Sequence, residues 1–533
     1  MSSIDFLERD RARIESRALP PSLYALFAET ASRCPTDPFW ITVDGEGSTL
    51  SYAEFDARVR RCAASLRRFG IGGGTHVAVV MHNSPELGTT WLALSLLGAV
   101  AIGVNAGLTA SELNYILRSS EAEVVIADRD ALPLLEARSL SARPRMLLRG
   151  QVAPGEHAWD EVMQADAARL EPRSVDPDEM ASMLFTSGST GFPKPCMLPH
   201  RWHTMIGWVR SQQGPPVRRI LIDTPLYYMG GQWRFAMAMF LGAAVCVARK
   251  PSLSRYLDRL QEYEIEFCSA SELTAKLADD PRYGSISIVW ACSTGLSGEL
   301  QPALETRLGA PVREIYGSTE LGSTIVMPTA VTDMVGSGSC GAPSAWRRCK
   351  IVGEQAQELP PGRSGELWVQ GPGTLLGYYG RPDANAESFV DGWFRTGDLF
   401  TRDADGFYYW QGRIKNIIRR SNQNISADEV EAAVRVLPEV AEAAVIPVAD
   451  AYRGEEVKLY VRLKPGLSAS DISPQRLVDR CREVLAPYKV PRYLEYIDAF
   501  PRTASNKVSR QALKAAKPDL RAGSFDVQDG LWR

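Results

Sequence analysis

The segment LFTSGSTGFPKP, residues 184–195, has the residue types of a loop that binds an anion. Its glycines allow backbone angles that a Cβ would forbid, and successive N–H groups in such a turn form a concave anion site. Four hydroxyl side chains and the positive charge of Lys194 add groups that suit phosphate. Pro193 stands where the P-loop pattern has glycine, so the segment is not a P-loop. Taken alone, it also fits a flexible surface turn.

A second turn, EIYGSTELGS at residues 314–323, carries groups that suit a nucleotide and a metal ion. Tyr316 offers a flat face for a base, and Thr319 offers a donor to phosphate. Glu320 offers a hard oxygen ligand for Mg²⁺. We therefore predict that this turn and the first segment bind the same nucleotide.

Three later segments each contain a charged residue that could contribute to a site. FRTGDLF places Asp398 beside a glycine, which is a weak signal alone because TGD occurs in many loops. GRIKNIIRRSNQNISADEVE contains Lys415, and PRTASNKVSR sets Lys507 between small and polar neighbours. Without further context, Lys507 is an ordinary solvated loop lysine, and the residues around Lys415 are a charged linker.

In this order and spacing, the motifs resemble the adenylate-forming superfamily, which includes acyl-CoA synthetases, the adenylation domains of peptide synthetases and firefly luciferase. The resemblance covers nearly the whole chain and includes LSYAEFDARVRRCAASL and NAGLTASELNYILRSSEAEVVIAD. It implies that a carboxylic acid attacks the α-phosphate of ATP to give an acyl adenylate and pyrophosphate, and that a thiol, usually CoA, then takes the acyl group. The implied cofactors and co-substrates are ATP, Mg²⁺ and CoA. Because adenylation joins anions, it needs charge neutralisation and alignment more than acid–base chemistry.

The resemblance also assigns roles to single residues. Lys194 and Thr186 would act on the phosphates, Glu320 would bind Mg²⁺, and Lys507 would bridge the acid's carboxylate and the α-phosphate, a task that suits a mobile point charge. Asp398 would accept hydrogen bonds from both ribose hydroxyls, assisted by Arg413. The implied ATP or AMP site comprises Thr186, Ser187, Gly188, Ser189, Thr190, Gly191, Lys194, Ser293, Thr294, Gly295, Glu314, Ile315, Tyr316, Gly317, Ser318, Thr319, Asp398, Arg413 and Lys507.

The acyl pocket implied by the resemblance has no aspartate at its start, where amino-acid-activating relatives often hold a partner for the ammonium group. We therefore expect an apolar carboxylic acid rather than an amino acid. The same residues also fit a plain hydrophobic core. They are His203, Met205, Tyr228, Met229, Gly230, Trp233, Gly322 and Ser323.

Lys415 stands at the position of the superfamily's hinge, which swings a small C-terminal domain between the two half-reactions. The swing would withdraw Lys507 and bring the CoA-side loop to the thiol route. Pro195 follows the loop lysine where relatives usually have glycine, and Tyr228 replaces a frequent histidine. Asn422 also replaces a usual glycine, in the loop that lines the thiol route in relatives. The implied CoA-side residues are Ser421, Asn422, Gln423 and Asn424.

Two alternatives remain open from the sequence. One is an adenylating enzyme that loads the phosphopantetheine of a carrier protein in trans. The other is a nucleotide-binding protein without turnover, against which the intact charged set argues. That set is Lys194, Glu320, Asp398, Arg413 and Lys507.

The elements that position these residues alternate between apolar strands and amphipathic helices, which is typical of parallel sheets covered on both faces. Strand-like runs at residues 76–81, 122–128, 220–226 and 243–248 follow this pattern. Past about residue 350, turn residues every eight to ten positions favour short antiparallel strands. We therefore predict an α/β fold. It has a large N-terminal domain of parallel-type sheets with a short β-barrel-like part, residues 1–413, and a small mobile α+β C-terminal domain, residues 414–533. The last residues read as a surface segment.

Composition sets the remaining limits. A net charge of −3 gives no bulk attraction to nucleic acid or anionic lipid. The apolar runs at residues 91–104 and 235–248 are too short for a membrane span and fit a buried helix that leads into a strand. Nine scattered cysteines without a CxxC pair argue against a zinc site or a disulfide framework and favour a reducing cytoplasm. A homodimer is compatible with these data.

Overall fold

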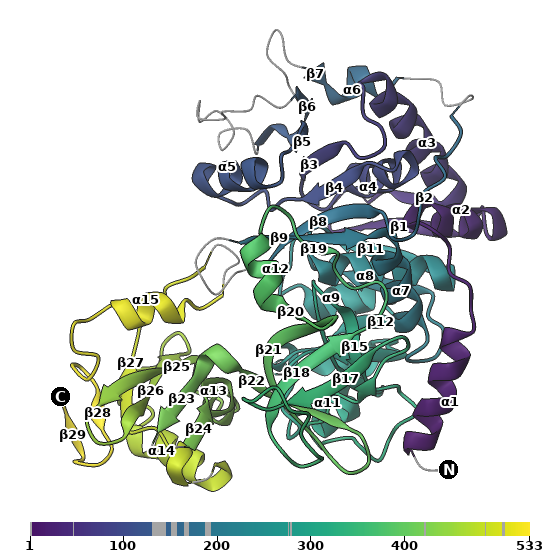
Figure 1. Cartoon of the computed structure of the whole chain (residues 1–533). Coiled ribbons are helices and arrows are strands. Elements are labelled where there is room, and N and C mark those ends of the chain that lie inside the picture. The colour runs from purple at the N-terminus through teal and green to yellow at the C-terminus, as the bar shows by residue number, and fades with distance from the viewer. Residues whose placement is uncertain are drawn as a thin grey trace. The chain divides into compact units, whose positions relative to one another are not determined.

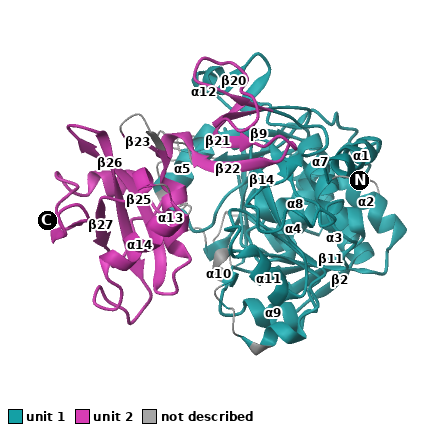
Figure 2. Cartoon of the chain, turned by 90° about the horizontal axis from the view of Figure 1, so that it is seen from below, with its two compact units in different colours: residues 1–349, 369–394 teal, residues 350–368, 395–533 magenta. Residues whose placement is uncertain are grey.

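The structure is a computed structural model (Figure 1). It describes residues 3–45, 47–130, 145–150, 157–164, 170–186, 193–275, 277, 280–420, 423–485, 487–503 and 507–533. The chain divides into two compact units, each made of two separate stretches (Figure 2). Unit 1 comprises Met1–Cys349 and Val369–Phe394, and unit 2 comprises Lys350–Trp368 and Arg395–Arg533.

The first large sheet of unit 1 has a parallel centre and antiparallel edges. Every residue of its strand at Ala244–Ala248 is buried, as expected for a parallel strand covered on both faces. In spatial order its nine strands are β16 (Ala342–Pro343), β15 (Gly322–Val326), β14 (Val312–Ser318), β13 (Trp290–Ser293), β12 (Phe267–Ser269), β10 (Arg219–Ile222), β11 (Ala244–Ala248), β1 (Pro38–Val43) and β2 (Thr49–Ser51).

The second large sheet of unit 1 combines parallel strands with an antiparallel hairpin at one side. The hairpin carries both ends of the predicted phosphate loop. In spatial order its eight strands are β19 (Gly377–Tyr378), β9 (Lys194–Pro199), β8 (Met180–Thr186), β4 (Val100–Gly103), β3 (His76–Val80), β5 (Val124–Asp128), β6 (Arg145–Arg149) and β7 (His157–Ala158).

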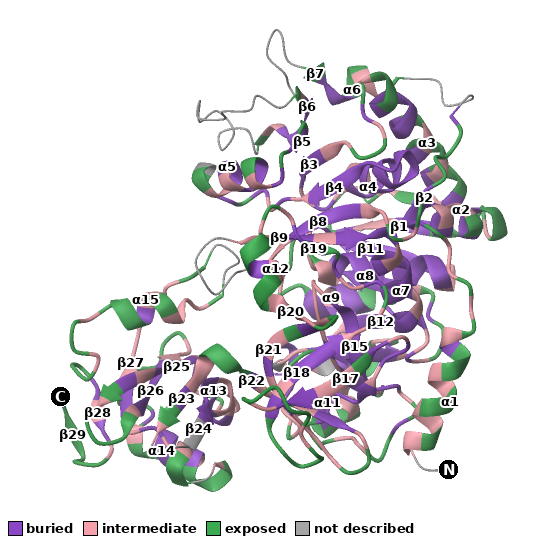
Figure 3. Ribbon diagram, in the orientation of Figure 1, coloured by how far each residue is buried: buried purple, intermediate pink, exposed green. Residues whose placement is uncertain are grey.

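Helices cover the two sheets, and Figure 3 shows their buried residues in purple. The helices at His200–Ser211 and Met229–Leu241 approach so closely that a Cβ on Gly207 would lie 2.6 Å from the Cβ of Ala236. The helices of unit 1 are α1 (Ser3–Glu15), α2 (Leu23–Arg33), α3 (Tyr52–Arg68), α4 (Pro85–Leu97), α5 (Ala110–Ser119), α6 (Trp159–Val162), α7 (His200–Ser211), α8 (Met229–Leu241), α9 (Tyr256–Glu262), α10 (Glu272–Ala275), α11 (Gln301–Leu308) and α12 (Pro382–Ser388), with a 3-10 helix η2 (Pro281–Ser285).

A third sheet corrects the prediction of a barrel-like part. Its described strands form an open path in which the two ends do not pair. The spacing of turn residues predicted short antiparallel strands correctly, but it does not show whether the sheet closes into a barrel. The strands are β17 (Arg348–Val352), β18 (Gly365–Gln370), β21 (Trp393–Arg402), β20 (Phe389–Val390) and β22 (Tyr408–Arg413), the last paired with β21.

The C-terminal part of unit 2 is an α+β structure around a long hairpin. A helix begins after Ser426, and the Ser426 hydroxyl accepts from the N–H of Glu429. Its sheet contains β24 (Gln423–Ser426), β23 (Ile417–Arg420), β26 (Gly454–Leu463), β27 (Tyr493–Tyr496), β28 (Phe525–Asp526), β29 (Leu531–Trp532) and β25 (Val440–Asp450), and its helices are α13 (Ala427–Arg435), α14 (Pro474–Val484), α15 (Arg510–Ala515), η3 (Ile414–Asn416) and η4 (Pro487–Lys489).

The chain end forms two short strands of this sheet, and most of its residues are exposed, as expected of a surface segment. Asp526 on β28 is fully buried and accepts from the guanidinium groups of Arg492 and Arg533. The sequence pattern could not show this, because a strand of two residues has no periodicity.

Other predictions from the sequence are confirmed. The strands expected at residues 76–81, 122–128 and 243–248 are β3, β5 and β11. Both long apolar runs are a buried helix leading into a strand, α4 into β4 and α8 into β11. All nine cysteines lie in described residues and are free thiols. Among the described residues, no helix has the length and apolar character that crossing a bilayer requires.

Candidate active site

The hairpin of β8 and β9 brings two predicted phosphate-binding residues together. Thr186 ends β8, Lys194 begins β9, and the two pair in register. Both side chains are half-buried. The loop between them lies outside the described residues, and with it lie the predicted Ser187, Gly188, Ser189, Thr190 and Gly191.

Tyr378 joins Lys194 to the predicted magnesium ligand. Nζ of Lys194 lies 4.4 Å from the centroid of the Tyr378 ring. The phenol of Tyr378 donates a hydrogen bond to Oε1 of Glu320 over 3.2 Å. Burial, and then the charge of Glu320, raise the pKa of Tyr378 well above its usual range, so the phenol stays protonated as a donor. Lys194 and Glu320, far apart in sequence, are therefore held around one aromatic ring.

The position of Tyr378 is fixed by backbone contacts on both sides. In β19, Tyr378 pairs with Cys196 of β9, and the N–H of Tyr379 donates to the carbonyl of Pro195. The amide of Asn385, on α12, accepts from the Tyr378 N–H over 2.7 Å and donates to the Tyr378 carbonyl over 3.0 Å. Sequence reasoning missed Tyr378, since β19 has only two residues and its pairing with β9 is long-range.

Glu314 organises the predicted adenine strip. Its carboxylate accepts from the hydroxyl of Ser293 and from the N–H of Gly295. It also accepts from the N–H of Leu296 over 3.3 Å. Gly295 has φ +72°, a conformation that favours glycine. Thr294, next in the strip, is exposed. The end of β13 is therefore tied to β14 by a buried charge.

The turn from β14 to β15 presents the predicted base and phosphate contacts. Tyr316 is buried at 9 % exposure, and Ile315, Gly317, Ser318 and Thr319 flank it. A Cβ on Gly317 would lie 2.2 Å from the carbonyl oxygen of Gly322, so only glycine fits that approach. The buried Arg347 donates to the carbonyl of Leu321 over 2.8 Å, which fixes the end of the turn after Glu320.

The predicted acyl pocket residues gather on α7, α8 and β15. His203, Met205 and Trp233 are buried, whereas Tyr228 is 37 % exposed. Nε2 of His203 lies 2.9 Å from the hydroxyl of Ser182, and burial lowers the pKa of His203 to about 3, so the ring is neutral. Met229 and Gly230 start α8, and Gly322 and Ser323 start β15.

Asp398 and Arg413 form an ion pair within unit 2. They face each other across β21 and β22, with Nε of Arg413 2.8 Å from Oδ1 of Asp398. Asp398 is 1 % exposed, and Nε1 of Trp410 donates to the same oxygen over 3.3 Å. The resemblance names Asp398 and Arg413 together, whereas no motif pointed to Trp410.

Two other predicted residues of unit 2, Lys415 and Lys507, are exposed. The backbone N–H of Lys507 donates to the hydroxyl of Thr503 over 3.2 Å. Lys415 lies on η3. Ser421 and Asn422 lie outside the described residues, and the backbone of Gln423 and Asn424 begins β24.

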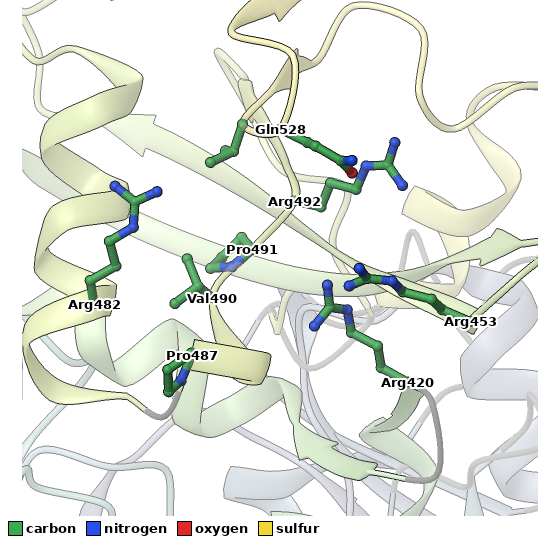
Figure 4. Close-up of a pocket in the computed structure, with 9 residues that line it drawn as sticks. Arg420, Arg453, Arg482, Pro487, Val490, Pro491, Arg492 and Gln528 are labelled. Carbon is green, nitrogen blue, oxygen red and sulfur yellow. The ribbon is translucent and has the colours of Figure 1, made fainter.

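A cavity of about 460 Å³ in unit 2 is lined by arginines and apolar side chains (Figure 4). Arg420 and Arg453 share the buried carboxylate of Glu456, at 2.6 Å and 3.5 Å. Guanidinium groups of this kind suit phosphate, which they bind through two parallel hydrogen bonds. The lining residues are Arg420, Arg453, Arg482, Pro487, Val490, Pro491, Arg492, Val527 and Gln528.

Comparison with known families decides the identity of the fold. A family model described as AMP-binding enzyme matches residues 27–379, which is more than half of the chain. The chain belongs to the AMP-binding enzyme family. A second model, AMP-binding enzyme C-terminal domain, matches residues 429–507. The resemblance inferred from the motifs is thereby confirmed.

Relatives in the family resemble the chain over nearly its full length. A fatty acid–[acyl-carrier-protein] ligase, ScoC, of Streptomyces coeruleorubidus is 30% identical, over 93% of this chain and 96% of its own. A feruloyl-CoA synthase of an Amycolatopsis species is 31% identical, over 89% and 96%. The structure of o-succinylbenzoate CoA synthetase from Bacillus subtilis with an acyl-adenylate intermediate is 27% identical, with a TM-score of 0.79 over 92% of this chain and 98% of its own.

Proposed function

We propose that this AMP-binding enzyme is an AMP-forming acid–thiol ligase. It activates a carboxylic acid with ATP to an acyl adenylate and then transfers the acyl group to CoA. The observation that carries the proposal is the cluster of Thr186, Lys194, Glu320 and Tyr378, which gathers hydroxyl, ammonium and carboxylate groups at the ends of the predicted phosphate loop. These are the groups that align and neutralise anions, as adenylation requires.

The unit 1 residues suit an ATP–Mg²⁺ complex. The carboxylate of Glu320 is a hard oxygen ligand that a phenol orients, so the donor set fits Mg²⁺. When bound, the ion supplies charge neutralisation at the phosphates. Lys194 and Thr186 bind the β- and γ-phosphates, and Tyr316 contacts the base beside the strip that Glu314 holds. The carboxylate of Glu314 binds the end of β13 and so keeps that strip in place.

The unit 2 residues complete the proposal. Asp398 binds the ribose hydroxyls, with Arg413 holding its carboxylate, and Lys507 bridges the acid and the α-phosphate. Lys415 is the hinge between an N-terminal domain, residues 1–413, and a C-terminal domain, residues 414–533. Support for this division comes from the separate family match that begins past Lys415, at residue 429.

CoA is the acceptor that we favour, and the arginine-lined cavity of unit 2 supports an acceptor that bears phosphates. A carrier-protein phosphopantetheine is the second candidate. It is favoured by the likeness to a fatty acid–[acyl-carrier-protein] ligase. We further propose that the enzyme acts in the cytoplasm, in agreement with its free thiols.

Acid-dependent exchange of labelled pyrophosphate into ATP tests the activation step. We expect exchange with acids whose carbon skeleton is apolar, and thioester formation when CoA is added. Supplying holo-carrier protein in place of CoA separates the two acceptors. A protein that binds ATP but exchanges no pyrophosphate with aliphatic, aromatic or alicyclic acids would be a nucleotide-binding protein without turnover.

A further inference from the structure

Two buried guanidinium groups share one tryptophan ring in unit 1. The central carbon of the Arg210 guanidinium lies 4.2 Å from the ring centroid of Trp233, and that of Arg234 lies 4.6 Å from it. Arg210, in the last turn of α7, is 0 % exposed, and Arg234, on α8, is 3 % exposed. Two positive charges are therefore concentrated in the interior around a single side chain.

The two arginines differ in the number of hydrogen bonds that their guanidinium groups make. Arg234 donates to the hydroxyl of Thr224 and to the carbonyl of Gly230, both over 2.8 Å, and to the hydroxyl of Ser269. Nε, Nη1 and Nη2 of Arg210 have no hydrogen-bond partner in the part of the chain that the structure describes. Among the same residues, neither arginine has an ion pair with a carboxylate. Arg210 is thus a buried charge that lacks a counter-charge.

A buried charge of this kind is strongly unfavourable unless it forms an ion pair with an anion, because burial removes its hydration. Attraction to the Trp233 ring offsets part of that cost. The thiol of Cys292, on β13, lies beside Arg210 but is only a weak acceptor. Burial and the neighbouring charge of Arg234 lower the pKa of Arg210 to about 10, so the group is still charged at neutral pH.

The location of this pair connects it to the acyl site. Trp233 and Gly230 belong to the predicted acyl pocket, and Gly230 accepts from Arg234. Ser269 ends β12, and its hydroxyl lies 3.6 Å from the thiol of Cys292. Cys292 directly precedes Ser293, whose hydroxyl donates to Glu314 in the nucleotide strip. Ligands of open α/β sheets bind at these carboxyl ends of strands.

We propose that Arg210, supported by Arg234, binds a second carboxylate at the far end of the acid that this enzyme activates. The inference rests on the proposed function and narrows it. The substrate has an apolar middle and two acidic ends, one adenylated and one held at Trp233. This proposal revises the expectation of a wholly apolar acid. That expectation came from the types of the pocket residues alone and did not include Arg210.

Pyrophosphate exchange with matched acids tests the proposal: hexanoate against adipate, and benzoate against terephthalate. The wild-type enzyme should prefer one of the diacids over its monoacid partner. In Arg210→Met, kcat/KM for that diacid should fall about 10- to 100-fold, the range expected for losing a charge-assisted hydrogen bond. Exchange with the monoacid should stay the same or rise.

Thermal melting separates recognition from a structural role. Without acid, Arg210→Met should melt at or above the wild-type temperature, because methionine removes an uncompensated charge. Arg313→Met is the matched control, since Arg313 is equally buried but is paired with Glu305 and with the carbonyl of Thr329. That control should melt lower. The preferred diacid should raise the melting temperature of the wild type but not of Arg210→Met.

Failure of the inference and failure of the proposed function give different results. Exchange with monoacids but with neither diacid would overturn the second carboxylate and leave the ligase activity standing. An equal loss on monoacid and diacid in Arg210→Met, with melting lowered as in Arg313→Met, would make Arg210 a structural residue. Absence of exchange with every acid would instead count against the proposed function, and diacid-dependent melting would still test Arg210.

Discussion

Tyr378 donates a hydrogen bond from its phenol to Oε1 of Glu320 over 3.2 Å. The same ring lies 4.4 Å from Nζ of Lys194. One aromatic side chain therefore sets the distance between the cation proposed to bind phosphate and the carboxylate proposed to bind magnesium. Because the phenol is buried and its pKa is raised, it stays protonated as a hydrogen-bond donor at neutral pH.

Removing only the phenol oxygen of Tyr378 tests this arrangement. Tyr378→Phe keeps the ring against Lys194 but leaves Glu320 without its oriented donor. A lost hydrogen bond to a charged group corresponds to about 1.5–3 kcal/mol, or roughly 10- to 150-fold. We expect pyrophosphate exchange to fall within that range and to need more Mg²⁺. An unchanged magnesium dependence would show that the phenol does not orient the metal ligand.

Glu314→Gln should loosen the nucleotide strip. The amide keeps the size of the carboxylate but removes the charge that accepts from Ser293, Gly295 and Leu296. Hydrogen bonds to a charged group are about twice as strong as neutral ones. We expect KM for ATP to rise more than kcat falls, measured at saturating acid. If kcat falls while KM for ATP stays constant, Glu314 does not act through the adenine site.

Particular residues show what the sequence could and could not predict. The β3 to α4 unit was predictable because its apolar residues run continuously in the strand and a serine cap opens the helix. The pair of Asp398 and Arg413 was predictable because both belong to motifs. Tyr378 and Arg210 were not, since their roles arise from the pairing of β19 with β9 and from the packing of α7 on α8. Such contacts leave no local periodicity.

Arg453→Ala should affect the second half-reaction alone. Its side chain lines the cavity of unit 2 and is partly exposed, so its loss leaves the fold intact. If the cavity binds the phosphates of CoA, KM for CoA should rise about tenfold, the effect of one charge-assisted contact, while pyrophosphate exchange is unchanged. Arg476→Ala, a surface change on α14 outside the cavity lining, is the matched control. Equal KM values for CoA in the two variants would exclude the cavity.

Stability should fall as the pH drops below the usual pKa of histidine. Burial lowers the pKa of His203 to about 3 and that of His200 to about 4. Between pH 6.5 and about 5 the unfolded chain binds protons at these rings and the folded chain does not. Each ring then changes the free energy of unfolding by up to about 1.4 kcal/mol per pH unit. His200→Gln should reduce the slope of denaturant-measured stability against pH in this window, and an unaltered slope would contradict the buried neutral ring.

Lys507→Ala separates the two half-reactions. Lys507 is exposed within unit 2, and only its backbone N–H donates to Thr503, so replacing the side chain should leave the fold unchanged. Because its charge is proposed to bridge the acid and the α-phosphate, adenylation measured by pyrophosphate exchange should fall by orders of magnitude. Transfer to CoA from a supplied acyl adenylate should remain largely intact, since a swing about Lys415 would withdraw Lys507 before that step. If the rates of both steps fall equally, both half-reactions require Lys507, and the proposed swing is wrong.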